Sequence, residues 1–157
     1  MADPVALVGQ PRFNHVAMSM PAEALNAEGR SQILAFYSEV FGWQELPTET
    51  IDRRRLVMSV YRLDQFVFLI ANDEPMQGPR MDHFGLGVAT EAELDTFYER
   101  AKRFRERDSR VDIIDKKVDE FSTLALTSFY VRYLLPMMVE VQYWSWGLQP
   151  PLPETAG

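Results

Sequence analysis

The two histidines of the chain are the feature that most constrains its fold, because each opens a short apolar run. His15 begins the run His-Val-Ala-Met, and His83 begins the run His-Phe-Gly-Leu-Gly-Val. A Phe-Tyr pair follows each run, Phe36-Tyr37 in the first half and Phe97-Tyr98 in the second. The histidines are 68 residues apart and the pairs are 61 residues apart, so about the same block of sequence occurs twice. A divergent repeat of this length predicts two similar modules within one domain.

Composition excludes several classes of protein. A chain of 157 residues with 46% hydrophobic and 25% charged residues is typical of one globular domain with a real core. The formal charge of −7 disfavours a protein that binds the phosphates of nucleic acid. No cysteine is present, so thiolate metal sites and disulfides are excluded, and a reducing compartment fits. The most continuous apolar segment, Phe66–Ala71, is too short to span a bilayer, and residues 1–10 lack the pattern of a signal peptide. We therefore expect a cytoplasmic protein without a membrane partner.

The first module is predicted to contain a strand and then a helix. Phe13, His15 and Ala17 alternate with Asn14, Val16 and Met18, which favours a strand with two differently occupied faces. Residues 22–30 are polar and predict a loop, either a plain connector or a lid. Ser31 is the expected N-cap of the helix, and Gly42 is placed to end it in a left-handed conformation. The apolar stripe of this helix consists of Ile33, Phe36, Tyr37, Val40 and Phe41.

The rest of the chain predicts three strands, a linker, and a repeat of the same plan. Strands are expected over residues 43–46, 54–63 and 66–71, and the linker over 72–80. In the second module a strand over 82–89 leads to Thr90 and Glu93, which have the spacing of a capping box at a helix start. Strands over 111–118, 124–133 and 137–144 follow that helix.

The pattern strand-helix-strand-strand-strand, present twice, predicts an α+β fold. We expect a single domain over residues 12–144, with module one at about 12–72 and module two at about 81–144. Residues 1–11 and 147–157 are expected to be flexible termini, since the latter are rich in proline and carry no periodic pattern.

One carboxylate stands out as a companion for the two imidazoles. Glu140 lies in the otherwise apolar run Met-Met-Val-Glu-Val, where an unpaired buried carboxylate costs too much free energy and therefore needs a cation or a donor. Two neutral imidazoles and one carboxylate form the facial triad of metal enzymes, which leaves coordination positions open for substrate.

Residues 36–43, Phe-Tyr-Ser-Glu-Val-Phe-Gly-Trp, resemble the helix end of the vicinal oxygen chelate superfamily, which comprises glyoxalases, bleomycin resistance proteins and extradiol dioxygenases. His15 in the first strand, residues 82–86 with His83, and Glu140 in the final strand resemble the same family. The resemblance covers residues 12–144. It implies two βαβββ modules whose curved mixed sheets form a metal-binding cleft, with His15, His83 and Glu140 as ligands.

The resemblance also assigns roles to other positions and shows departures. The place where glyoxalases often carry a fourth ligand holds Phe68, so three protein ligands are expected, and Gln65 is the only nearby polar substitute. Tyr130 matches the position of a tyrosine that extradiol dioxygenases place beside the substrate, so it is the catalytic candidate. Residues 134–137, Leu-Leu-Pro-Met, replace a longer turn that many relatives have before the final strand.

The leading functional hypothesis is a metal-dependent enzyme resembling extradiol dioxygenases. It would use Fe(II) or Mn(II), with Zn or Ni as further possibilities, and a small substrate that chelates the metal through vicinal oxygens. One alternative is a glyoxalase-type lyase or isomerase, or a thiol transferase, with Glu140 or Tyr130 as the base. The other alternative is a metal-free protein that binds a small drug-like molecule. The resemblance further implies a homodimer.

Overall fold

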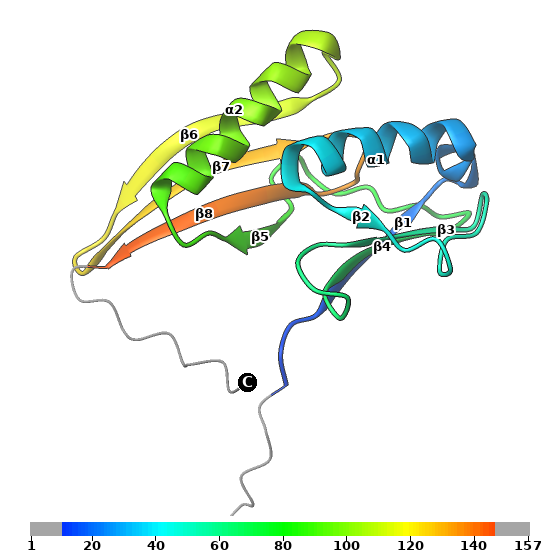
Figure 1. Cartoon of the computed structure of the whole chain (residues 1–157), viewed down its shortest axis with the longest axis horizontal. Coiled ribbons are helices and arrows are strands. Elements are labelled where there is room, and N and C mark those ends of the chain that lie inside the picture. The colour runs from blue at the N-terminus through cyan, green and yellow to red at the C-terminus, as the bar shows by residue number, and fades with distance from the viewer. Residues whose placement is uncertain (1–10, 147–157) are drawn as a thin grey trace, which may run out of the picture.

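A computed structural model describes residues 11–146 of the chain, and its elements form two successive βαβββ units (Figure 1). The first unit contains β1 (His15–Met20), a short 3-10 helix η1 (Ala22–Leu25), α1 (Ala27–Phe41), β2 (Gln44–Glu45), β3 (Arg55–Ser59) and β4 (Phe66–Ala71). The second unit contains β5 (His83–Gly87), α2 (Glu91–Arg107), β6 (Asp112–Glu120), β7 (Leu124–Arg132) and β8 (Met138–Trp146). The expected flexible termini, apart from position 11, lie outside the described residues. Within residues 11–146, no helix has both the length and the apolar composition needed to cross a membrane.

The two units have the same strand order, which confirms the predicted α+β fold class. The first sheet has the order β1-β4-β3-β2 and the second the order β5-β8-β7-β6. In each sheet the first and last strands of the unit pair in parallel, and the other neighbours pair antiparallel. Both sheets are therefore mixed four-stranded sheets, and they lie side by side without closing on each other (Figure 1).

The strand register reproduces the internal repeat residue by residue. His15 pairs with Phe66 across β1 and β4, and His83 pairs with Met138 across β5 and β8. Glu140 lies two residues beyond the partner of His83, so the equivalent position in the first unit is Phe68. The phenyl ring of Phe68 cannot bind a metal, as expected from the sequence.

Both helices lie on the same side of the two sheets (Figure 1). Alternate strand residues point toward the helices and are buried; Met18, Leu69 and Met58 are each at most 1% exposed. Phe36 and Tyr37 of α1 are fully buried and join the two units. The ring of Phe36 packs at 5.0 Å from those of Phe104 and Tyr133, and the Tyr37 hydroxyl accepts a 3.2 Å hydrogen bond from the Tyr133 N–H.

The start of the first helix differs from the prediction. The helix begins at Ala27, with Asn26 rather than Ser31 as its N-cap; the Asn26 side chain accepts a 2.8 Å hydrogen bond from the Gly29 N–H. The region 22–30 is thus mostly helical and is neither a plain connector nor a lid. The apolar stripe misplaced this boundary because the first helical turn, residues 27–30, carries no large apolar side chain and packs closely against η1 at Gly29. The other helix signals are confirmed: Gly42 has φ 75°, and Thr90 and Glu93 form the capping box.

We predict that Gly29→Ala destabilises the protein, although alanine normally stabilises a helix by up to about 1 kcal/mol relative to glycine. A Cβ at position 29 would overlap the backbone carbonyl of Ala24, so η1 and α1 would have to separate. The free energy of unfolding in urea should fall by about 1–3 kcal/mol. Gly87→Ala is the control, because a Cβ there meets nothing within 4 Å, and its effect should be under about 0.5 kcal/mol. An unchanged or higher stability of Gly29→Ala would contradict this account.

Candidate metal centre and the pocket between the modules

His83 and Glu140 lie on the same face of the second sheet, the face that carries no helix. Glu140 pairs with Gly85 across β5 and β8, and Gly85 is two residues after His83, so alternation places both side chains together. The His83 Nε2 atom is 3.3 Å from Oε2 of Glu140. Gly85 has no side chain to separate them. Two of the three predicted ligands therefore meet within one chain.

The orientation of His83 is fixed by the backbone. Its Nδ1 is 2.7 Å from the carbonyl oxygen of Met81. A carbonyl only accepts hydrogen bonds, so Nδ1 carries a proton, and Nε2 is the ring nitrogen that faces Glu140. Two acceptors at this distance need a shared proton or a cation between them. A backbone carbonyl on the second nitrogen is also the usual support of a histidine that binds a metal.

Glu140 is almost completely buried, at 3% exposure, and its orientation is also fixed. The amide Nε2 of Gln142 donates a 2.6 Å hydrogen bond to Oε2 of Glu140. The indole N–H of Trp144 can only donate, and it donates to Oε1 of Gln142 at 3.1 Å, which places the Gln142 NH2 group at the carboxylate. A chain of two hydrogen bonds thus leads from the half-exposed Trp144 to Glu140.

Tyr130 completes this cluster. It pairs with Glu140 across β7 and β8, and its ring meets the His83 ring edge-on, with the centroids 5.0 Å apart. Burial of the phenol, followed by the nearby Glu140 carboxylate, raises the pKa of Tyr130 to about 12. The phenol is therefore protonated at neutral pH. This state suits a hydrogen-bond or proton donor and disfavours the alternative role of Tyr130 as a base.

The donor atoms of this cluster fit a divalent metal ion. Two ligands that each lie about 2.1 Å from one cation are about 3.0 Å apart at an octahedral angle and about 3.4 Å apart at a tetrahedral angle. The 3.3 Å between His83 Nε2 and Glu140 Oε2 lies within this interval. One imidazole nitrogen and one carboxylate oxygen are suitable for Fe(II), Mn(II), Zn or Ni.

His15 lies apart from this pair. It projects from the helix-free face of the first sheet, stacks on Phe66 with the ring centroids 5.0 Å apart, and has Nδ1 2.8 Å from Oδ1 of Asn14. Within residues 11–146, no group of three His, Cys, Asp or Glu side chains is placed to hold a metal. A single copy of the chain thus brings together His83, Glu140 and Tyr130, but not His15.

Gln142 belongs to the site but was not predicted from the sequence as a functional residue. Its position was visible in the sequence, since Met138, Glu140 and Gln142 alternate along one strand and so share a face. Its hydrogen bonds to Glu140 and Trp144 were not visible, because they depend on the rotamers of three neighbouring side chains.

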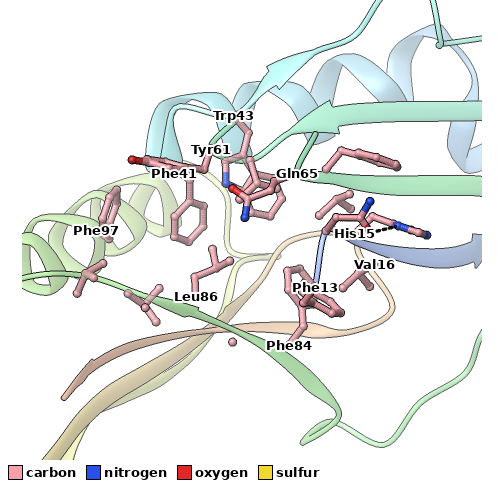
Figure 2. Close-up of a pocket in the computed structure, with 18 residues that line it drawn as sticks. Phe13, His15, Val16, Phe41, Trp43, Tyr61, Gln65, Phe84, Leu86 and Phe97 are labelled. Carbon is pink, nitrogen blue, oxygen red and sulfur yellow. Dashed lines mark hydrogen bonds between the residues drawn. The ribbon is translucent and has the colours of Figure 1, made fainter. Parts of the chain in front are cut away.

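A pocket of about 410 Å³ lies between the two units (Figure 2). His15, Val16 and Phe66 line it from the first sheet, and Phe84 and Leu86 of β5 line it from the second. Figure 2 shows Phe41, Trp43, Phe97 and Gln65 around the same space. His83 and Glu140 are not among its lining residues, so the pocket and the His83–Glu140 pair are separate places.

Comparison with known proteins establishes the fold. No protein-family model matches the sequence, and no curated protein sequence matches it. Solved structures do match. A lactoylglutathione lyase from Agrobacterium tumefaciens is 15% identical with a TM-score of 0.58, over 87% of this chain and 96% of that one. A glyoxalase/bleomycin resistance protein/dioxygenase from Alicyclobacillus acidocaldarius is 16% identical with a TM-score of 0.57, over 85% and 91%.

A third similar structure is a variant of the fosfomycin resistance protein FosX from Listeria monocytogenes, complexed with Mn(II) and 1S,2S-dihydroxypropylphosphonic acid. It is 12% identical with a TM-score of 0.56, over 87% of this chain and 93% of that one. The chain therefore has the fold of the vicinal oxygen chelate proteins. The resemblance identified in the sequence is confirmed at the level of the fold.

We predict that Tyr130 forms little tyrosinate in chelator-treated protein at about pH 10.5, where an exposed tyrosine is mostly ionised. The difference in tyrosinate absorbance between wild type and Tyr130→Phe measures the ionised fraction of the Tyr130 phenol. In a Glu140→Gln background the same difference should be larger, because loss of the carboxylate removes one of the two main causes that raise the pKa of Tyr130, while burial still raises it.

Glu120→Gln, which changes an exposed carboxylate of β6, is the control and should leave the Tyr130 absorbance unchanged. Full ionisation of Tyr130 at about pH 10.5 in wild type would contradict the described cluster.

Proposed function

We propose that the protein is a metal-dependent enzyme that acts on a small substrate with two vicinal oxygens. The observation that carries the proposal is the His83–Glu140 pair, with Nε2 and Oε2 3.3 Å apart and the proton of His83 held on Nδ1 by the Met81 carbonyl. A buried carboxylate oxygen and an imidazole nitrogen that face each other are two potential metal ligands oriented for a shared cation.

We assign the third ligand, His15, to a second copy of the chain. His15 lies on the helix-free face of the first sheet, and His83 and Glu140 lie on the helix-free face of the second. Both faces present apolar side chains to solvent: Ile70 is 41% exposed on the first, and Trp144 and Trp146 are 39% and 37% exposed on the second. Two copies related by a two-fold axis would cover both faces and bring His15 of each copy to the pair of the other.

The resulting set of two imidazoles and one carboxylate favours Fe(II) or Mn(II), with Zn or Ni as alternatives. His83, Glu140 and His15 would hold the metal through three ligands only, which would leave room for the vicinal oxygens of a substrate, as an extradiol-type dioxygenase requires. When bound, the metal supplies Lewis-acid polarisation of the substrate oxygens. The phosphonate-bearing diol bound by the similar FosX structure is a ligand with vicinal oxygens.

Residues of the chain itself orient the two metal ligands and supply a hydrogen-bond donor to the substrate. The Met81 carbonyl holds the His83 ring, and Gln142 holds the Glu140 carboxylate, so both donors are oriented before any ligand arrives. Tyr130, 8% exposed and protonated, can donate a hydrogen bond to a substrate oxygen beside His83.

A second candidate is a lyase, isomerase or thiol transferase. The protonated Tyr130 beside Glu140 favours it, since one group can donate a proton while the other accepts one. The pocket between the modules favours a third candidate, the binding of a small molecule without a metal.

We predict that protein purified without chelator contains about one divalent metal per chain, and that His83→Ala and Glu140→Gln each lower the affinity at least about tenfold. Elemental analysis and calorimetric titration measure these changes. Glu120→Gln is the matched carboxylate control and should bind metal as wild type. Equal affinities in wild type and Glu140→Gln would refute the proposed centre.

The assignment of His15 to a second copy has its own test. His15→Ala and Glu140→Gln are each expected to lose the metal, but mixed and refolded together they should recover about one quarter of wild-type binding. Half of the dimers would then be mixed, and each mixed dimer would hold one intact site. No recovery, with dimers present, would contradict sharing between copies.

We predict that the Fe(II)-loaded protein consumes oxygen with a catechol as substrate, and that Tyr130→Phe lowers kcat more than it raises KM. An oxygen electrode measures the reaction. If the protein contains bound iron but consumes no oxygen with any of a panel of catechols, the hypothesis of a dioxygenase is refuted. Formation of lactoylglutathione by the Mn(II)-loaded or Zn-loaded protein would then favour the lyase.

A further inference from the structure

We propose that the pocket between the modules is a second binding site, which needs no bound metal, for a small, flat, uncharged aromatic molecule that carries an N–H or O–H donor. Neither His83 nor Glu140 lines this pocket, so the proposal does not require the metal centre, although His15, assigned above to the metal of a second copy, is one of the lining residues. Its volume of about 410 Å³ is within the range of small-molecule sites.

The walls of the pocket are aromatic and come from both units (Figure 2). The ring of Phe41 at the end of α1 lies 5.6 Å from that of Phe97 in α2 and 5.5 Å from that of Trp43. The ring of Trp43 is in turn 6.5 Å from that of Phe84 in β5. These contacts form a continuous cluster, against which a flat aromatic ligand can stack.

No Asp, Glu, Lys or Arg side chain is among the described residues that line the pocket. Transfer of a charged group into such surroundings would cost free energy without a countercharge to offset it. The ligand class is therefore uncharged.

Gln65 supplies the polar specificity. Its Oε1 atom is buried and has no hydrogen-bond partner among the described residues, although the side chain lines the pocket. The backbone of Gln65 is held in the turn before β4: its N–H donates to the Arg62 carbonyl at 2.9 Å, and its carbonyl accepts from the Val60 N–H at 2.9 Å. An unsatisfied buried acceptor is unfavourable, so a ligand donor toward which the Gln65 amide turns its Oε1 gains both a hydrogen bond and relief of that cost.

Indole and 1-methylindole test the proposal, because both are flat and uncharged but only indole has an N–H. With full-length protein kept metal-free by chelator, calorimetry should show saturable one-to-one binding of indole. The affinity for 1-methylindole should be about tenfold lower, as expected for loss of a hydrogen bond to a buried acceptor. In NMR spectra, indole should shift the backbone amides of Gly85 and Gly87, which line the pocket.

Gln65→Leu should reduce the preference for indole over 1-methylindole to about twofold or less. Gln44→Leu, the same substitution at an exposed glutamine of β2, is the control and should keep the preference. The proposal is overturned if indole does not bind, if wild type binds both compounds equally, or if Gln65→Leu retains the preference. It is also overturned if the shifts centre on Trp144 and Trp146 instead of the pocket.

Discussion

The packing of α1 against the second unit is the interaction on which the rest of the structure depends. Phe36 stacks on Tyr133, and the buried hydroxyl of Tyr37 accepts the Tyr133 N–H, so the two sheets are held side by side with both helices on one side. Strand alternation then sends apolar residues toward the helices and the chemically active residues to the opposite faces. The separation of His15 from His83 and Glu140 follows from this arrangement.

The cluster on the second sheet is oriented by hydrogen bonds from its own neighbours. The Met81 carbonyl fixes His83, Gln142 fixes Glu140, and Trp144 fixes Gln142. Because these contacts form within one sheet, the two donors are oriented without a contribution from the first unit. A donor from elsewhere is needed only to complete the site, which is why we assign His15 of a second copy to it.

The sequence predicted the fold well because the signals were local and repeated. Gly42, Thr90 and Glu93 marked helix ends, and Phe66–Ala71 was predicted as a strand over the residues that form it. The start of α1 was misplaced because its first turn carries no large apolar side chain and packs closely against η1 at Gly29. The pairing of His83 with Glu140 was predictable from the resemblance and from the shared face of alternate strand residues. The separation of His15 from that pair depends on how the units pack, which no local pattern encodes.

The central claim is that His83 and Glu140 bind one metal ion together with His15 of a second copy. A crystal structure of protein purified without chelator, with anomalous data collected at the edges of Mn, Fe, Ni and Zn, tests it most directly. We predict one anomalous peak per chain, about 2.0–2.2 Å from His83 Nε2, Glu140 and the imidazole of His15 from the other copy. Metal-loaded crystals with no peak between His83 and Glu140, or with these two side chains pointing apart, would contradict the account.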